Sequence, residues 1–513
     1  MAQRNPTEAA AIWAARFARI AMTLSGLMLL LFVYTALRRL RYPFELDRME
    51  SAMMTSVWRL AHGQPLYARP SLDWTPFLYA PLFFYASLAF SKTVGLGYAA
   101  LRAVSLLATL GTVVVLYLHV WRETHHRAAA ICAAGVYLSL YSWCLGWYDI
   151  GRVDSLSVFF FVLALYCMRF APTPIAAIVW VLAFQTKQGF LPIGLLVFLA
   201  YWRTPKRMAL NMGIYVVLAF ASIQWMQHVS GGWYSYYVFG TVKQLAASKR
   251  MALLYLPFDL LQPLAIAVML CLLAVLLRPV RWMQSTGLFY AWITVLMVGS
   301  IGFARAHDGS NLNTVMPVYV WMALLLGVAL ARLALLDAAP VFACLVWLMV
   351  IAQMAAHLYR PVQFVPDAYT LAQRQGFIQL LRNTPGDVWL TNHSYDSVMA
   401  EKAPHAEMDA LDAALDTDPA LAADVRSTLA QRHFTAIFLD RVPESYSPHW
   451  LFNAAPFAET YRKQMLAPMS QVDTTTDQPA FAYLPCDAPE STLEQLHLQG
   501  SFARQGQCLP GAR

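Results

Sequence analysis

The chain has 513 residues, of which 59% are hydrophobic and 13% are charged. A soluble globular protein carries roughly a quarter of charged residues, so this composition excludes a protein that is exposed to water along most of its length. The formal net charge of +8 does not indicate nucleic-acid binding, because the excess of Lys and Arg is confined to residues 1–357, where the cytoplasmic loops of a membrane protein collect such residues, and no basic patch is interleaved with aromatic residues.

Apolar bands of about 20 residues recur along the chain, and each is long enough to span a hydrocarbon core of about 30 Å. We therefore predict a polytopic α-helical membrane protein with about eleven transmembrane helices. The first band is not interpreted as a signal peptide, because no small-residue cleavage site follows it and many more bands come later. The expected spans are 19–38, 98–120, 128–146, 155–170, 174–186, 188–202, 208–228, 257–277, 284–304, 313–333 and 339–357.

Basic residues orient the predicted helices. The N-terminus carries Arg4, Arg16 and Arg19, and the breaks WRETHHR (121–127) and WRTPKR (202–207) fall on the same side of the membrane. Because cytoplasmic loops are rich in Lys and Arg, we expect a cytoplasmic N-terminus. The segments expected on the outer face are 39–97, 147–154, 229–256, 305–312 and everything after 358. Most acids of the membrane part fall on that face, which membrane insertion does not explain because acids contribute little to topology.

The first outer loop, residues 39–97, contains two apolar segments that we do not count as spans. SAMMTSVWRLAHG (51–63) has apolar residues at near-helical spacing and predicts a helix that lies on the membrane surface. TPFLYAPLFFYASLAF (75–90) is interrupted by Pro76 and Pro81. Counting it as a span would reverse every later loop, so we interpret it as interfacial or re-entrant.

Two carboxylates precede the first of these surface helices. Asp47 and Glu50 lie three positions apart and share a face if they are helical. A carboxylate beside the membrane can act as a general base toward a sugar hydroxyl, and partial burial would raise its pKa toward a useful range. Solvation of the interface or capping of the helix explains the same two residues, so spacing alone leaves both interpretations open.

A second polar cluster lies in WYDIGRVDSLSVFFF (147–161), directly before a predicted span. Asp154 could cap that helix, but capping does not account for Arg152. An Arg held between Asp149 and Asp154 can receive a phosphate or position a carboxylate. A structural ion pair is the alternative.

Two further breaks carry polar groups to the outer face. Lys187 in AFQTKQGFLP (183–192) is a lone cation between two short apolar spans. A cation at such a place is usually functional, and lipid phosphate is the nearest anion, although a snorkelling Lys is the alternative. RAHDGSNLNTVMPVY (305–319) adds His307 and Asn313, and capping by Asn is the simpler explanation there. Together, the four clusters indicate a site for a lipid phosphate and a hydroxylated substrate.

The C-terminal part, residues 358–513, differs in character from the rest. GDVWL (386–390) and FTAIFLD (434–440) read as short strands, and they flank an acidic helical stretch from about 404 to 432. This order predicts a small α/β domain. We therefore divide the chain into a transmembrane catalytic domain, residues 1–357, and an outer α/β domain.

The tail after about residue 465 is rich in Thr, Gln, Pro and Gly, and we expect it to be loop. It contains Cys486 and Cys508, which could form a disulfide because the outer compartment permits one, although the sequence leaves this open. The other five cysteines lie in apolar spans, where a thiol behaves as a small hydrophobe. The sequence contains no cysteine spacing typical of a metal site.

These segments resemble the GT-C integral-membrane glycosyltransferases that use polyprenyl-phosphate sugars, in their bacterial relatives. ELDRMES followed by GQPLY resembles the family's first outer loop, where an acidic residue is the catalytic base. TPFLYAPLFFY is similar to the Tyr- and Pro-rich surface helix of the family, and YDIGRVDSL, TKQ and NTVMP also resemble family patterns. The resemblance covers roughly residues 20–360 and, more weakly, the outer domain.

The resemblance implies an inverting transfer of a hexose or pentose from a polyprenyl-phosphate donor to an acceptor hydroxyl. The enzyme would work at the outer face of a bacterial inner (plasma) membrane, with the C-terminal domain in the periplasm. Many members have adjacent Asp and Glu in the first loop, whereas here Met49 precedes Glu50 and Asp47 lies further back. We expect Glu50 to be the base, because it has the expected spacing before GQPLY, with Asp47 as the alternative.

The same resemblance implies which residues contact the donor. Lys187 and Arg152 would stabilise the charge on the departing polyprenyl phosphate. The other residues expected in the substrate site are Asp149, Asp154, Tyr79, Gln188, His307 and Asn313. No Asp-x-Asp pair occurs in the first loop, so we expect no obligatory metal cofactor, although some relatives use one.

The expected partners are the lipid-linked donor, an acceptor that is a glycan, a lipid or a protein, and membrane lipids, but not nucleic acid. A transporter or flippase for a lipid-linked glycan is the main alternative, because it would bind the same lipid phosphate. Such a protein would more often show broken helices in matching halves, and the sequence shows no such repeat. A polymerase or ligase of surface polysaccharide is a third, chemically related hypothesis.

Overall fold

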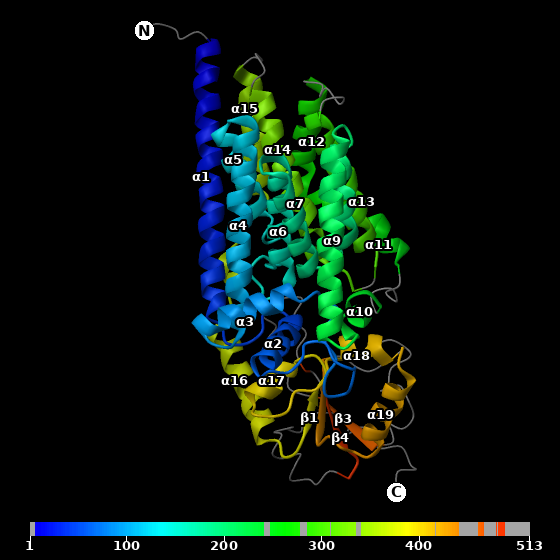
Figure 1. The fold of residues 1–513 in the computed structure, drawn as a ribbon. Coiled ribbons are helices and arrows are strands. Elements are labelled where there is room, and N and C mark those ends of the chain that lie inside the picture. The colour runs from blue at the N-terminus through cyan, green and yellow to red at the C-terminus, as the bar shows by residue number, and fades with distance from the viewer. Residues whose placement is uncertain are drawn as a thin grey trace.

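The fold is seen in a computed structural model. It describes residues 6–240, 247–277, 285–307, 309–334, 340–415, 417–440, 460–465, 479 and 481–487. A long helical bundle carries a smaller α/β unit at one end, and α1 begins at the other end (Figure 1). The chain is a polytopic α-helical membrane protein, as the composition predicts.

Within the described residues, seven helical stretches are long and apolar enough to cross a membrane. They are α1 (Pro6–Leu40), α4 (Tyr98–Thr124), α6 (Val153–Phe170), α9 (Pro205–Val229), α11 (Lys249–Leu254) continued through a π-helical turn (Tyr255–Leu261) into α12 (Gln262–Leu277), α13 (Ser285–Arg305), and a 3₁₀ turn (Leu312–Val315) continued into α14 (Met316–Ala334). Shorter apolar helices in the bundle are α5 (Arg127–Ser139), α7 (Thr173–Thr186), α8 (Phe190–Leu196) with a 3₁₀ turn (Val197–Tyr201), and α15 (Pro340–Ala355). Each predicted span overlaps one of these helices, and the number of crossings stays a prediction.

One span is shorter than its apolar sequence suggests. The expected helix 128–146 ends as α5 at Ser139. Leu145 has φ +51° and Gly146 has φ +74°, which are left-handed conformations that a helix does not contain. A Cβ on Gly146 would lie 2.8 Å from an Arg39 guanidinium nitrogen. Residues 140–146 therefore form a compact turn beside the start of the site.

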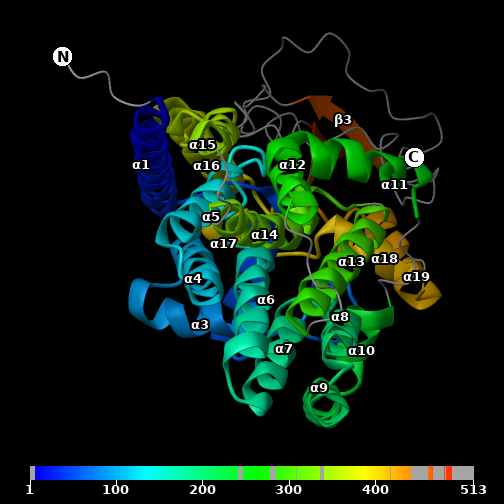
Figure 2. The same ribbon diagram turned by 90° about the horizontal axis from the view of Figure 1, so that it is seen from above.

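Helix α14 lies in the middle of the bundle, surrounded by α5, α6, α12 and α13 (Figure 2). Its side chains are buried almost all round, and Tyr319 and Trp321 are among the largest of them. A helix that is apolar on every face is expected at the centre of such a bundle. α14 therefore provides a fixed support for the polar residues at its N-terminal end.

The first outer loop forms two helices at the end of the bundle that faces the α/β unit (Figure 1). Helix α2 (Arg48–Ala61) confirms the helix expected at 51–63, and it begins three residues earlier. Helix α3 (Leu82–Val94) starts directly after Pro81, so residues 75–81 are not helical as the apolar run suggested. Proline fixes φ and lacks an N–H, so it is tolerated at a helix start but not inside.

The α/β unit contains the expected strands and helices. Its four-stranded sheet has the order β1-β2-β4-β3, with β1 parallel to β2 and β4 antiparallel to both its neighbours. The strands are β1 (Val388–Leu390), β2 (Ala436–Leu439), β3 (Tyr461–Met465) and β4 (Phe481–Pro485). The helices are α16 (Ala368–Asn383), α17 (Ser394–Met399), α18 (Met408–Leu415) and α19 (Pro419–Ala430). β1 and β2 confirm the predicted strands.

The tail departs from the loop that its composition suggests. The run FAYLP forms β4, a central strand of the sheet, so the expectation of loop after residue 465 was wrong for this segment. Ala482 and Leu484 are fully buried, and burial of this short apolar run overrides the polar composition around it. Cys486 is disulfide-bonded. Cys508 lies outside the described residues, so the predicted Cys486–Cys508 pair stays a prediction.

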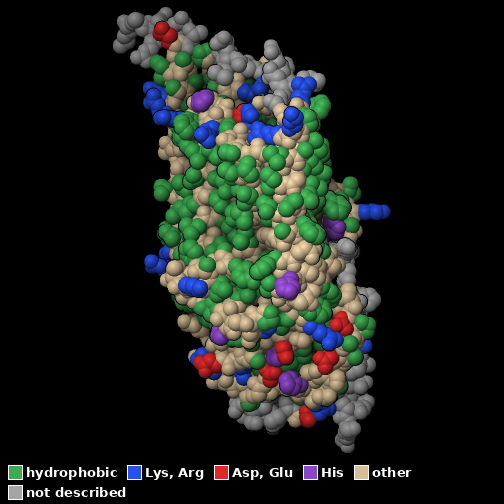
Figure 3. Space-filling view, in the orientation of Figure 1, with side chains coloured by type: hydrophobic (Ala, Val, Ile, Leu, Met, Phe, Trp, Pro, Cys, Tyr) green, Lys and Arg blue, Asp and Glu red, His purple; other side chains and the backbone are tan. Residues whose placement is uncertain are grey.

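The surface divides into three zones along the bundle (Figure 3). A broad apolar band covers the helices on the face shown, as expected where lipid chains contact the protein. Lys and Arg side chains gather at the end where α1 begins, and Asp and Glu side chains gather on the α/β unit. Cytoplasmic ends of membrane proteins are rich in Lys and Arg, and the orientation with the basic end in the cytoplasm stays a prediction.

Candidate active site

The site is built around the start of α2, where the first outer loop meets the membrane bundle. Asp47 is the N-cap residue of this helix, and its Oδ1 accepts a hydrogen bond from Met49 N at 3.1 Å. The same oxygen accepts one from Arg152 Nη1 at 2.9 Å. The helix cap and the ion pair therefore both use Oδ1 of Asp47. Among the described residues, its Oδ2 receives no hydrogen bond.

Glu50 lies one turn later and is held in a different way. Arg102 donates to both of its oxygens, at 3.0 Å from Nε and 2.6 Å from Nη2. The backbone amides of Gly151 and Leu46 donate to the same two oxygens at 2.5 Å and 2.7 Å. The side chain is fully buried. Glu50 thus joins α2, α4 and the 147–152 turn, and four hydrogen bonds occupy its carboxylate.

The pKa directions of these two carboxyl groups are opposite. Burial acts to raise the pKa of Glu50, but the Arg102 guanidinium and the two backbone amides outweigh burial and keep this pKa below its ordinary value. Burial raises the pKa of Asp47, and the opposing effect of the nearby cations, mainly Arg152, only partly offsets it. A general base needs a free oxygen, and it works best when its pKa is shifted toward the operating pH and not below its ordinary value. Asp47 meets both conditions and Glu50 meets neither.

Gly151 allows the backbone to approach Glu50 this closely. A Cβ at Gly151 would lie 2.7 Å from the Leu101 Cβ and 3.1 Å from Glu50 Oε1. Real Cβ atoms essentially never approach another carbon to 2.7 Å, so a larger residue would push the turn away from α4. The close packing at this position therefore explains why a glycine stands in YDIGRVDSL.

Next to Asp47, Arg152 begins a chain of alternating charges. Its Nε lies 3.2 Å from Asp154 Oδ2, and Asp154 Oδ1 accepts from Lys187 Nζ at 2.7 Å and from Asn313 Nδ2 at 3.0 Å. The Asp154 carboxylate therefore connects three side chains, Arg152, Lys187 and Asn313, instead of capping a helix. Asn311, not Asn313, caps the 3₁₀ turn before α14, so capping does not explain Asn313.

Lys187 is the accessible cation of this cluster. Its side chain is 21% exposed, whereas those of Arg152 and Asp154 are 6% and 2% exposed. Lys carries three N–H donors and Arg carries five, so both retain donors beyond the bonds described above. An anionic group that enters beside Lys187 can be bound without breaking the pairs that hold the cluster.

The remaining predicted residues fall in two groups. Tyr79 Oη lies 3.5 Å from Arg152 Nη2, and Gln188 donates to the Leu78 carbonyl, so both border the cluster. Asp149 instead pairs with Arg39 at 2.8 Å. His307 is half-exposed and bonds to the Phe303 carbonyl through Nδ1. Neither Asp149 nor His307 itself thus makes a described contact with Arg152, although other residues of both sequence clusters do join the chain of charges.

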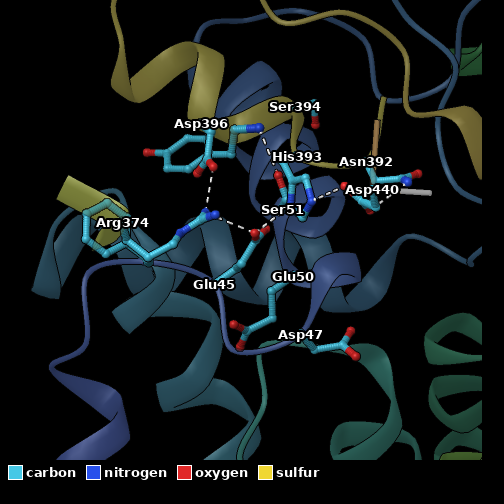
Figure 4. Close-up of polar contacts among 12 residues, drawn as sticks. Glu45, Asp47, Glu50, Ser51, Arg374, Asn392, His393, Ser394, Asp396 and Asp440 are labelled. Atoms are coloured by element: carbon cyan, nitrogen blue, oxygen red, sulfur yellow. Dashed lines mark hydrogen bonds and ion pairs between the residues drawn. The ribbon is translucent and has the colours of Figure 1, made fainter. Parts of the chain in front are cut away.

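A second buried network connects the same loop to the α/β unit (Figure 4). Glu45 Oε1 lies 2.5 Å from His393 Nδ1 and 3.0 Å from Arg374 Nη2. Arg374 also pairs with Asp396 at 2.5 Å, and His393 Nε2 pairs with Asp440 at 2.8 Å. Burial disfavours the imidazolium, but Asp440 and Glu45 outweigh burial and raise the pKa of His393 well above its ordinary value.

Sequence reasoning missed the basic partners of these carboxylates. Arg102 lies inside the apolar span 98–120. A cation within a membrane segment is usually functional, and this reasoning, which pointed to Lys187, applies equally to Arg102. Arg374 and His393 are 329 and 348 residues from Glu45 in the chain. No local signal in the sequence links residues so far apart.

Three residues of the second network could each offer one ligand atom to a metal ion. Ligand atoms of Glu45, His393 and Asp396 lie within 4.8 Å of one another. The Arg374 guanidinium already bridges the two carboxylates, so a metal ion would have to displace it. The protein itself supplies the positive charge that these carboxylates require.

Solved structures with this fold include two of one protein. ArnT from Cupriavidus metallidurans in the apo state matches with a TM-score of 0.58 and 14% sequence identity, over 93% of this chain and 98% of that chain. The structure of ArnT bound to undecaprenyl phosphate matches with a TM-score of 0.57 and 14% identity, over 92% and 97% of the two chains. No protein-family model and no curated protein matches the sequence.

Proposed function

We propose that this chain, which has the fold of the GT-C glycosyltransferases, transfers a sugar from a polyprenyl-phosphate donor to an acceptor hydroxyl at the outer face of a bacterial inner membrane. The observation that carries the proposal is the pair formed by Asp47, a carboxylate with one unengaged oxygen, and Arg152, which continues to the accessible cation Lys187. A base and an anion-binding group lie side by side, as a transfer from a phosphate ester requires. The undecaprenyl phosphate bound by ArnT supports a lipid phosphate as the anion.

In the proposed reaction the acceptor hydroxyl attacks the anomeric carbon of the donor. Asp47 removes the hydroxyl proton through Oδ2 as the new carbon–oxygen bond forms. The bond between the anomeric carbon and the phosphate oxygen breaks, and the electron pair leaves with the polyprenyl phosphate. A single displacement inverts the configuration at the anomeric carbon.

Lys187 and Arg152 act on the leaving group. Charge develops on the phosphate oxygen as the bond breaks, and donors that already point at that position stabilise the transition state more than the ground state. Asp154 and Asn313 hold Lys187 in place, since Asp154 Oδ1 accepts from both side chains. In this proposal Glu50 is the support of the α2 start and Asp47 is the base, which differs from the order that the sequence resemblance favoured.

The orientation follows from charge. The basic end of the bundle would face the cytoplasm, and the active site and the α/β unit would face the periplasm. A lipid-linked donor is already activated, so the reaction needs no nucleotide sugar in that compartment. The acceptor can be a glycan, a lipid or a protein, and the α/β unit would border its path to Asp47.

The test is sugar transfer by the purified protein in detergent, with a panel of polyprenyl-phosphate sugars. Asp47→Asn should abolish turnover while donor binding is retained. Asp409→Asn is the matched control, because Asp409 forms a half-exposed ion pair with Arg48, the residue next to Asp47. Full turnover in Asp47→Asn would refute the assignment of the base. Lipid movement across vesicles without transfer to any acceptor would favour the flippase instead.

A further inference from the structure

We infer that Arg374 and His393 of the α/β unit are positioning residues for the Asp47 base and act on it through the Glu45 carboxylate. This inference rests on the proposed function, in which Asp47 is the base. It gives the α/β unit a part in the chemical step, in addition to its proposed place beside the path of the acceptor.

The side chains of the segment before α2 point in different directions. Glu45 and Asp47 are separated by one residue, yet they contact opposite parts of the protein. Glu45 reaches toward Arg374 and His393 of the α/β unit, and Asp47 lies on the other side of the segment (Figure 4), where it meets Arg152 of the bundle. The position of the base is therefore set from two sides.

The Glu45 anchor, by which we mean the Glu45 carboxylate with its basic partners Arg374 and His393, is closed to water. The side chains of Glu45, Arg374 and His393 are 0–2% exposed. Removing either basic partner would leave a carboxylate that water cannot reach and that has lost part of its charge balance. The segment would then have to move to solvate Glu45. Such a move would shift Asp47, because only Leu46 separates the two residues.

Helix α17 of the α/β unit also contacts α2 directly. Ser51 Oγ, in the first turn after Glu50, accepts from the Tyr395 amide at 2.9 Å. One turn later, Thr55 Oγ1 and Ser394 Oγ share a hydrogen bond of 2.8 Å. His393 immediately precedes Ser394, so the same turn of the α/β unit holds both Glu45 and the first turns of the helix that Asp47 caps.

The groups around the Glu45 anchor are mainly charged, and this explains why a His side chain fits at position 393. His393 faces Glu45 and Asp440, Arg374 faces Glu45 and Asp396, and Glu407 lies near. An imidazolium donates from both nitrogens, so one side chain satisfies carboxylates from two segments. A glutamine can replace only part of this bridge, because it carries no charge.

A double-mutant cycle between Glu45→Gln and His393→Gln tests the inference. Each single variant should lower kcat about 10²-fold, the cost of a small misplacement of a catalytic group, with the donor Kd unchanged. If His393 acts through Glu45, the double variant should also lose only about 10²-fold, whereas independent effects would multiply to about 10⁴-fold. Multiplied losses, or a kcat that neither variant changes, would overturn the inference.

A control and a second readout separate positioning from general destabilisation. Leu429→Ala removes a buried side chain of α19 in the core of the same unit and touches neither Glu45 nor α2. It should lower the melting temperature but leave kcat within about twofold, because cavity formation in that core does not move Asp47. An equal loss of kcat in Leu429→Ala would show that the unit acts only through its stability, and would overturn the inference.

Hydrogen exchange of the peptide that contains residues 44–50 should increase in Glu45→Gln and His393→Gln, but not in Leu429→Ala. This readout does not depend on turnover. Wild-type protein that transfers no sugar would refute the proposed function, and exchange would still show whether the anchor exists. Active wild-type protein with unchanged exchange and unchanged kcat in the variants would refute the inference alone.

Discussion

Replacing Glu50 by Gln tests whether this residue supports the site or performs the chemistry. The change removes one charge from a buried pair and leaves Arg102, whose side chain is 1% exposed, without its counter-ion. Breaking a buried ion pair costs about 3–5 kcal/mol. An unfolding entropy of about 2.1 cal/mol/K per residue, over 513 residues, converts this loss into a fall of about 3–5 °C in melting temperature.

Asp47→Asn is the informative comparison, because it should change turnover more than stability. Asn can still cap α2, and Arg152 keeps Asp154 as a charged partner, so the melting temperature should fall less than in Glu50→Gln. Turnover should fall by about 10²–10⁴-fold, the usual contribution of a general base. Thermal unfolding followed by tryptophan fluorescence and transfer of a radiolabelled sugar measure the two quantities on the same samples.

The two variants thus separate stability from turnover. Glu50→Gln should melt earlier and retain most of its turnover below the melting temperature. A stable Glu50→Gln protein without turnover, together with an active Asp47→Asn protein, would refute the reasoning and return the role of the base to Glu50.

Further predictions concern pH, the donor, the turn and metal ions. A base must be ionised, so with a raised pKa for Asp47 kcat/KM should fall on acidification at a pH above the ordinary value for Asp, about 3.9, and a pH profile measures this limb. Lys187→Met should raise the donor Kd about 10-fold or more, because a hydrogen bond to a charged group contributes about 1.5–3 kcal/mol, and binding of a fluorescent polyprenyl phosphate measures it. Gly151→Ala should lower stability by about 1–3 kcal/mol through overpacking against Leu101, which chemical denaturation in detergent measures. EDTA should leave transfer unchanged, because Arg374 supplies the charge at the one place where described residues could reach a common ion; a requirement for added Zn²⁺ or Mg²⁺ would contradict this.

The membrane helices could be predicted because lipid imposes a simple rule. An apolar run of the right length has few alternatives to a helix in a bilayer, so the span expected at 174–186 and the helix α7 (Thr173–Thr186) agree almost to the residue. The rule fails where the chain turns inside the protein. The apolar run that continues past Ser139 forms a turn rather than helix, because the protein interior, unlike lipid, offers Arg39 to the turn's carbonyl at Gly146.

The candidate site could be predicted in part for the same reason. Charges are costly beside a bilayer, so Arg152, Asp154 and Lys187 stood out from their apolar surroundings, and the structure brings them together. Asp149 stood out equally but pairs with Arg39. The cost of a charge shows that it must have a partner, and it does not show which partner the fold provides.

The choice between the two loop carboxylates shows the limit most clearly. In sequence, Glu50 has the better spacing, and nothing distinguishes its chemistry from that of Asp47. In the structure, four N–H donors converge on Glu50 and lower its pKa: two from Arg102, and one each from the Gly151 and Leu46 amides. Asp47 keeps one oxygen unengaged and has a raised pKa. Where two carboxyl groups have environments that push their pKa values apart, their roles separate accordingly. Three of these four donors come from Arg102 in α4 and from Gly151 in the turn before α6, so the proposed roles rest on the folded contacts and not on the order of residues in the loop.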